Sequence, residues 1–376
     1  MIYFDNSSTT KPCKKAIDNI NNALSVNWGN PSSLHNLGVE AEAIVTETRE
    51  KIAKLLNCRS DEIFFTGSGT EANNIAIMSF AGKKHAGKRI ITTAIEHPSV
   101  LNTVKRLENY GYEIVYLHPD KFGVISLADL EDALTDDTAL VSIMLVNNEI
   151  GAIQPVKEAA KITHEKAKNA LFHCDAVQAF GKLPINIKNL GVDILTASGH
   201  KIHGPKGVGV LYAKKGINLL PLISGGGQEH GLRSGTESVP LIAGLLGAVE
   251  DLPNLDMQLK TQAAFVKYAK QKLTESDLVV LNSGDNALPY ILNISVEGYR
   301  SETLLHFLES KEIYVSSGSA CAKGELSYVL NEIGLSKNLI DSNLRLSFNK
   351  ENTTEEIDKF VEALKEATTK IRKANI

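Results

Sequence analysis

A lysine stands between two apolar runs of this sequence, residues 192–196 and 208–212. Such runs are typical of buried strands, and the connection between them is polar and rich in glycine. It holds Ser198, His200 and Lys201. A partly desolvated lysine loses its proton more easily than a solvated one and becomes a nucleophile. Imine chemistry at Lys201 is therefore one interpretation, and an ordinary surface-loop lysine is the other.

A glycine-rich turn upstream has the features of an anion site. Residues 62–66 are predicted to form a strand, and a helix begins at Gly69 and Thr70. Free backbone N–H groups and the positive end of the helix dipole favour an anion there. Ser68 and Glu71 have the spacing of a capping box. The usual nucleotide-binding glycine patterns are absent, so a nucleotide is not the expected ligand, and many turns of this kind bind nothing.

Several polar side chains follow the predicted strands. Strands alternate with helices over the first two thirds of the chain, which indicates an α/β fold with a mostly parallel sheet. In such sheets, ligands bind beyond the carboxyl ends of the strands. The residues predicted to lie at that edge are His97, Asn148, Asp175, Gln178 and Lys201.

The composition changes at residues 250–256, where we place a domain boundary. We expect residues 14–256 to form a large domain, and residues 1–13 with 257–376 to form a smaller α+β domain. We predict a long helix from about residue 259, a strand over 139–146 and a helix over 156–168, and we place Ile371 on the face of the final helix.

A single cysteine lies in the small-residue segment Ser316-Ser-Gly-Ser-Ala-Cys321. A structural cysteine prefers an apolar core, whereas reactive thiols favour polar, accessible settings. Cys321 is either such a reactive thiol or an incidental loop residue.

The overall composition is that of an ordinary globular protein, with 43% hydrophobic and 22% charged residues. The net charge of −4 gives no indication of nucleic-acid or membrane binding. Four scattered cysteines and the lack of a signal pattern favour a reducing cytoplasm. His200 and His203 lack an acidic third ligand nearby, so we expect no metal site.

Three of these features together match the requirements of pyridoxal 5'-phosphate. Lys201 would hold the aldehyde carbon, Asp175 would keep the ring nitrogen protonated, and Gly69 with Thr70 would bind the phosphate. The other predicted cofactor contacts are His97 stacked on the ring, Gln178 and Asn148 near the ring oxygen, and Ser198 and His200 within reach of the phosphate.

The sequence resembles the cysteine desulfurases of the NifS/IscS type, within the class V aminotransferase group of pyridoxal-phosphate enzymes. The resemblance covers nearly the whole chain and rests on the ordered motifs GNPSSLH, FTGSGTEANN, EHPSV, VNNEIG, HCDAVQ, SGHKIHGPKGVG, GGGQEHGLRSGT, SSGSAC and LRLSF. The SSGSAC form resembles the first of the two family groups. The implied fold is the fold-type I transferase fold, with a mostly parallel seven-stranded sheet in the large domain and a smaller α+β domain.

The resemblance implies an activity and roles for named residues. L-cysteine would displace Lys201 from the cofactor, and Lys201 would then act as the base at the α-carbon. The Cys321 thiolate would attack the substrate sulfur, which leaves L-alanine and a persulfide on Cys321. His97 would handle the thiol protons.

The resemblance also implies partners. Arg345, assisted by Asn148, would pair with the substrate carboxylate, and Thr236 would reach the phosphate of the other subunit of a homodimer. The persulfide would pass to an acceptor protein, either an iron–sulfur scaffold or a tRNA-thiolation enzyme.

The chain departs from the family pattern in its DNSSTTKP segment, at His230 in place of arginine, and in a slightly shorter loop after Cys321. The sequence ends soon after the last predicted helix, so we expect no extension of the kind with which housekeeping members bind a scaffold. Two alternatives stay open: a selenocysteine lyase or another C–S lyase, and a sulfur-relay subunit without turnover. A sulfur-relay subunit would not need Lys201 or Asp175, so the presence of both residues argues against it.

Overall fold

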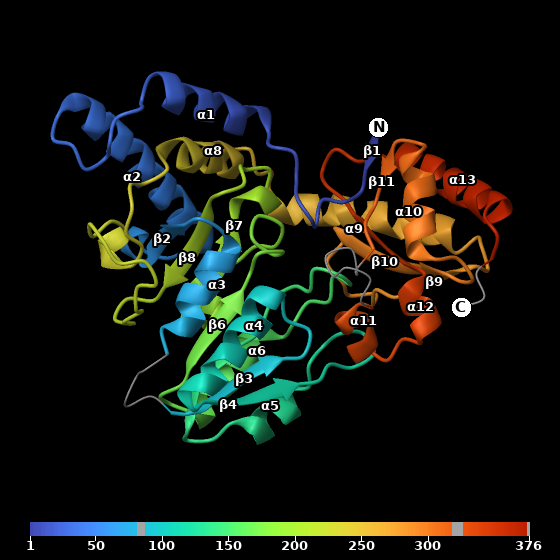
Figure 1. Ribbon diagram of the computed structural model, residues 1–376, viewed down its shortest axis with the longest axis horizontal. Coiled ribbons are helices and arrows are strands. Elements are labelled where there is room, and N and C mark those ends of the chain that lie inside the picture. Colours follow the sequence, from blue (N-terminus) through green and yellow to red (C-terminus); the bar gives the residue numbers. More distant parts are fainter. Residues whose placement is uncertain (81–86, 318–325, 374–376) are drawn as a thin grey trace.

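The computed structural model describes residues 1–80, 87–317 and 326–373 (Figure 1). Its main sheet has the strand order β2-β8-β7-β6-β5-β3-β4. β8 runs antiparallel to both neighbours, and the other pairs in the sheet are parallel. The predicted fold class, an α/β fold with a mostly parallel seven-stranded sheet, is confirmed. The strands are β2 (Ile63–Thr66), β3 (Arg89–Thr93), β4 (Glu113–Leu117), β5 (Thr138–Ser142), β6 (Leu171–Asp175), β7 (Ile194–Ser198) and β8 (Gly209–Ala213).

Helices cover this sheet, and the most buried of them is α8 (Val239–Glu250). Its residues are apolar on nearly every side because α1 and α2 pack against it (Figure 1). α3 packs against α4, and α5 packs against α6. These helices are α1 (Lys14–Ser25), α2 (Asn36–Leu56), α3 (Gly69–Met78), α4 (Pro98–Leu107), α5 (Leu127–Ala133), α6 (Val156–Lys166) and α7 (Ile187–Leu190).

The C-terminal third builds a separate antiparallel sheet with the order β12-β10-β9. The first strand of the chain, β1 (Ile2–Tyr3), pairs in parallel with β11 (Ile313–Tyr314), so the two ends of the sequence meet (Figure 1). Phe4 and Phe348 pack edge to face in this second core. The remaining elements are α9 (Leu255–Leu273), β9 (Val279–Leu281), β10 (Ile291–Val296), α10 (Ser301–Glu309), α11 (Tyr328–Glu332), α12 (Lys337–Asp341), β12 (Asn343–Ser347) and α13 (Thr354–Lys370).

Some predicted boundaries are wrong. The strand predicted over 139–146 ends at Ser142, because the Met144 N–H donates to Glu96 Oε1 at 2.8 Å instead of to a strand. The helix predicted to end at 168 ends at Lys166. The long helix starts at Leu255 rather than 259, since Asn254 caps it, and Ile371 lies beyond the end of the last helix.

The division into domains at residues 13/14 and 256/257 stays a prediction. Within the described residues, no helix is both long enough and apolar enough to span a membrane.

Candidate active site

Lys201 follows β7 on a short 3₁₀ turn, Gly199–Lys201. Its Nζ donates hydrogen bonds to the backbone carbonyls of Ser7 and Ser8, the second at 2.8 Å. The N-terminal segment therefore lies across the lysine and holds its amine on two uncharged acceptors. The sequence could not predict this contact, because every residue has a backbone carbonyl and the residue type does not indicate which carbonyl binds the lysine.

Asp175 ends β6 and is 5% exposed. Asn73 Nδ2 donates to its Oδ2 at 2.7 Å, and the Val177 N–H donates to its Oδ1 at 2.9 Å. Thr196 in turn donates to Asn73 Oδ1 and fixes the direction of that amide. Both donors are neutral, so they do not pair with the carboxylate as a counter-ion would, and a cationic partner such as a protonated ring nitrogen can do so.

Gly69 opens α3 at a point where no side chain fits. A Cβ on Gly69 would lie 2.8 Å from Val177 Cγ2 and 3.3 Å from Ser198 Cβ. Ser198 ends β7, so the start of α3 is close to the strand that leads to Lys201. Thr70, in the first turn of α3, is exposed. The free N–H groups at this helix start are available to an anion.

The predicted capping box is only half formed. Ser68 Oγ accepts from the Glu71 N–H at 3.1 Å, but the Glu71 carboxylate accepts from Arg233 Nε at 2.9 Å rather than returning to the cap. Arg49 holds Glu229 from the same glycine-rich segment through two 2.9 Å bonds. These two ion pairs, of which Arg49–Glu229 is the more buried, fix that segment against β2 and α3. The neighbouring His230, in the left-handed region, is exposed and meets Phe64 edge-on.

His97 caps α4, and its Nδ1 accepts from the Ser99 N–H at 3.1 Å. Desolvation by the surrounding protein lowers the pKa of His97, although the ring is exposed on one side. The charge of Asp175 raises this pKa and that of Lys201 lowers it further. A neutral imidazole within the field of both groups is suited to accept a proton.

Gln178 and Asn148 are held in different ways. Gln178 Nε2 donates to the Ser7 carbonyl at 3.0 Å, and its Oε1 accepts from Lys182 Nζ at 3.2 Å. Asn148 Oδ1 is buried, and within the described part of the chain it has no hydrogen-bond partner. An orphaned amide oxygen is costly, so a ligand that donates to it would be stabilised.

His200 and Thr236 are two further residues that the sequence predicts to contact the phosphate. His200 Nδ1 lies 3.2 Å from Thr9 Oγ1, and burial lowers its pKa to about 4, with Lys201 contributing. The ring is therefore neutral at neutral pH. Thr236 is exposed, and its neighbour Gly235 lines the same hollow as Gly67, just before α3.

Arg345 lies on β12 and is 6% exposed. Its Nη2 donates to Asp5 Oδ1 at 3.0 Å and to Ser8 Oγ at 2.6 Å, and its Nη1 donates to the Asn148 carbonyl at 3.1 Å. Nε is buried and, among the described residues, has no acceptor. The guanidinium thus joins both ends of the chain to the turn that holds Asn148, and it retains unused donors for a carboxylate.

Cys321 lies outside the described residues, but residues on either side of that stretch contact the site. The Ser316 N–H donates to the Arg345 carbonyl at 3.2 Å. Ser327 Oγ donates to Glu149 Oε2 at 2.6 Å, next to Asn148 in the sequence.

Together these side chains fit pyridoxal phosphate. A lysine, a buried carboxylate with neutral donors, a glycine-opened helix start and an orphaned amide oxygen match the groups of that cofactor. The sequence did not predict the residues that form hydrogen bonds with the predicted site residues. They are Asp5, Ser7, Ser8, Asn73 and Lys182. Spacing could have found Lys182, four residues after Gln178.

Comparisons with known proteins agree with this assignment. The model of the family "Aminotransferase class-V" matches residues 2–360. A "NifS/IcsS protein homolog" of Lactobacillus delbrueckii subsp. bulgaricus is 43% identical, over 100% of this chain and 99% of that protein. "Cysteine desulfurase IscS" of Methanosarcina thermophila is 40% identical, over 99% and 93%. A solved structure titled "NIFS-LIKE PROTEIN" has a TM-score of 0.92 and 37% identity, over 98% of this chain and 100% of that one.

Proposed function

The chain belongs to the aminotransferase class-V family, and from this we propose that it is a cysteine desulfurase. The observation that carries the proposal is the convergence of Lys201, Asp175 and the start of α3 on one site, in a chain whose relatives of that name match it over nearly their whole length. The family resemblance expected from the motifs is confirmed by these matches.

Pyridoxal phosphate, when bound, supplies an electron sink for charge that develops on the substrate α-carbon. Lys201 would hold its aldehyde carbon, Asp175 would hold the proton of its ring nitrogen, and Gly69 with Thr70 would bind its phosphate. His97, Asn148, Gln178, Ser198 and His200 complete the proposed set of contacts, with Thr236 from the second subunit.

The substrate would be oriented by Arg345 and Asn148. The unused guanidinium donors of Arg345 suit a carboxylate, which would lie beside Asn148. Lys201 would then take the proton from the α-carbon of L-cysteine, and His97 would accept a thiol proton. These residues thus bind the substrate, hold its orientation and move its protons.

We assign the sulfur transfer to Cys321. Its thiolate would attack the substrate sulfur, so that an S–S bond forms while the C–S bond breaks. The electron pair of the C–S bond stays on the substrate carbon, which takes up a proton and leaves as L-alanine. Cysteine and one thiol thus give alanine and one persulfide, and no external oxidant is needed.

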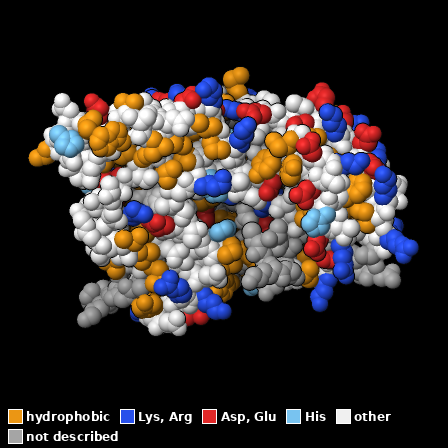
Figure 2. Space-filling model, turned by 45° about the horizontal axis from the view of Figure 1, so that its top comes forward, with side chains coloured by type: hydrophobic (Ala, Val, Ile, Leu, Met, Phe, Trp, Pro, Cys, Tyr) orange, Lys and Arg blue, Asp and Glu red, His pale blue; other side chains and the backbone are white. Residues whose placement is uncertain are grey.

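A homodimer is the proposed assembly. Large hydrophobic side chains are exposed around the end of α1 and the start of α2, and Figure 2 shows hydrophobic side chains gathered over this end of the molecule. They include Leu24, Val26, Trp28, Leu34 and Val39. Exposed apolar patches of this kind mark interaction sites, and a second copy would cover this one.

The persulfide would be passed to an acceptor protein, an iron–sulfur scaffold or a tRNA-thiolation enzyme. Cys13, Cys58 and Cys174 are free thiols, which suits the reducing cytoplasm in which we place the reaction.

The test measures alanine and sulfide released from L-cysteine with a reductant, for the parent protein and Cys321→Ala. We expect equal amounts of the two products and the loss of both in the variant. Cys58→Ala, which removes a partly buried free thiol elsewhere in the chain, should keep the parental rate. Pyruvate in place of alanine, or an unaffected Cys321→Ala variant, would point instead to a different C–S lyase or to a selenocysteine lyase.

A further inference from the structure

We infer that Lys182 is a positioning residue for the reacting amine: it orients the Gln178 amide and places a second positive group beside Lys201. This inference rests on the proposed function and deepens it, since it assigns the proposed site a residue that neither touches the substrate nor is required by the known chemistry of the cofactor.

Lys182 is an unusual buried residue. It is 7% exposed, and its Nζ donates to Gln178 Oε1 at 3.2 Å. Lysine is almost never buried unless it is paired with an acid. Within the described ranges, no carboxylate forms an ion pair with Lys182, and the Tyr290 ring, 5.9 Å away, supplies only a weak contact. A buried amine without a counter-ion costs stability, so a functional reason is expected.

A continuous chain of hydrogen bonds joins the two lysines. Lys182 donates to Gln178 Oε1, and Gln178 Nε2 donates to the Ser7 carbonyl at 3.0 Å. The Lys201 amine donates to that same carbonyl. If the Gln178 amide flipped, its NH₂ group would face the amine of Lys182, donor against donor. Lys182 therefore fixes which end of the amide faces Lys201.

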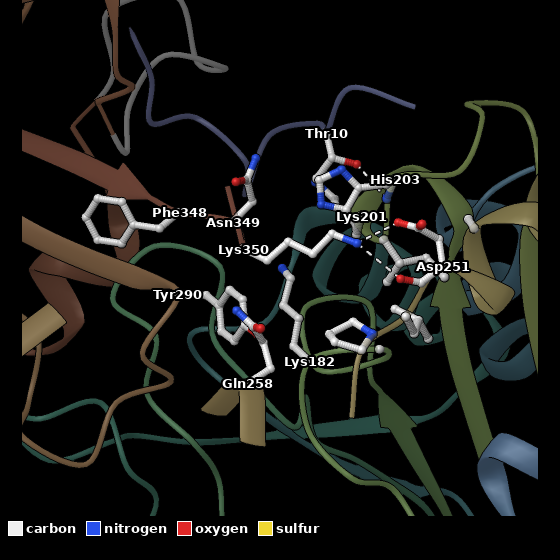
Figure 3. Close-up of a pocket in the computed structure, with 15 residues that line it drawn as sticks. Thr10, Lys182, Lys201, His203, Asp251, Gln258, Tyr290, Phe348, Asn349 and Lys350 are labelled. Carbon is white, nitrogen blue, oxygen red and sulfur yellow. Dashed lines mark hydrogen bonds and ion pairs between the residues drawn. The ribbon is translucent and has the colours of Figure 1, made fainter. Parts of the chain in front are cut away.

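The same two lysines line one cavity, with Tyr290 and Lys350 on its walls (Figure 3). The nearby carboxylate in this cavity, Asp251, is already bound by Lys350 at 2.6 Å. His203 is held by the Lys11 carbonyl at 3.0 Å. The charged groups that act on Lys182 are Lys201 and Arg345, and both are positive.

This environment sets the charge of Lys182 near neutral pH. Burial lowers the pKa of Lys182 to about 7, and the charges of Lys201 and Arg345 add to the effect. Repulsion between like charges acts equally on both partners. Below about pH 7, where Lys182 is protonated, its charge therefore disfavours a second charge on Lys201 and favours the neutral, nucleophilic form of Lys201.

The experiment follows covalent attachment of pyridoxal phosphate to Lys201, trapped with borohydride and located by peptide mass spectrometry, as a function of pH. It needs no turnover. We compare the parent with Lys182→Met, which keeps length but loses donor and charge, and Lys182→Arg, which keeps both. Lys214→Met is the matched control, because Lys214 pairs with Asp193 outside the site.

Attachment is followed as the pH falls below 7, where Lys182 is protonated. We expect the pH midpoint of trapping to rise by about one unit in Lys182→Met and to stay at or below the parental value in Lys182→Arg. The control should not move. A parental midpoint in Lys182→Met overturns the inference and leaves the proposed function intact. If Lys182→Met does not fold, a raised midpoint in Lys182→Arg overturns it instead. Failure of the parent to attach the cofactor to Lys201 overturns the proposed function itself.

Discussion

The two sides of the site are built differently. On the cofactor side, Asp175 and Lys201 follow adjacent strands of one sheet. Asp175 is held by Asn73 of α3, and the N-terminal segment adds the Ser7 and Ser8 carbonyls that hold the Lys201 amine. On the substrate side, Arg345 is held by Asp5 and Ser8, which lie 340 and 337 residues away in the sequence. The first side is placed mainly by the sheet, whereas the second exists only where the two ends of the chain meet. Changes on the first side should therefore abolish the chemistry, and changes on the second should weaken substrate binding.

The largest effect is expected for Asp175→Asn. Removing the buried charge opposite the ring nitrogen should lower kcat about 10²- to 10³-fold. The amide keeps the shape of the carboxylate but accepts only one of its two hydrogen bonds, from Asn73 or from Val177, so we expect a folded sheet with a modest loss of stability. Alanine formation and thermal unfolding together measure this. Asp193→Asn is the control, since Asp193 is equally buried at the opposite end of β7. Equal losses in both variants would show a structural effect only.

A smaller effect is expected for Arg345→Lys. Lysine keeps the charge but loses the planar fork that binds Asp5, Ser8 and a carboxylate at once. We expect KM for L-cysteine to rise about 10-fold with kcat nearly unchanged. Steady-state kinetics separate the two parameters. A fall in kcat at constant KM would contradict the contrast between the two sides.

The smallest effect concerns stability rather than activity. Glu96 is fully buried, where it accepts hydrogen bonds from Thr93 and Met144, and desolvation raises its pKa from 4.5 to about 8. The folded protein therefore binds more protons than the unfolded chain between these values, so the free energy of unfolding falls as pH rises through this window.

Glu96→Gln should remove that part of the slope of the free energy of unfolding against pH, which is at most about 1.4 kcal/mol for each pH unit. Denaturant unfolding at several pH values measures it. Glu149, whose pKa is raised to about 7, should leave a residual slope in the variant. A slope identical to the parent's would show that Glu96 is ionised in the folded protein.

The sequence predicts the cofactor side better than the substrate side. Asp175, Lys201 and Gly69 stand at strand ends and a helix start, positions that hydrophobic periodicity locates, and the sheet then brings them together. The roles assigned to these residues stay predictions, as does that of Cys321, which lies outside the described residues.

Other contacts have no local signal. Lys201 is held by carbonyls of Ser7 and Ser8, and any residue type offers a carbonyl. The burial of Lys182 depends on tertiary packing, with the Tyr290 ring 5.9 Å from its amine, and residue type alone does not reveal this packing. The end of β5 at Ser142 similarly depends on one bond from the Glu96 side chain.

The most direct test of the proposed desulfurase activity is to incubate the cofactor-loaded protein with L-cysteine in the absence of a reductant. The mass of the peptide that contains Cys321 is then measured. We predict a gain of one sulfur atom on Cys321, removed by a reductant, with one alanine formed for each persulfide. Alanine formed over many turnovers with no sulfur on Cys321 would contradict the account.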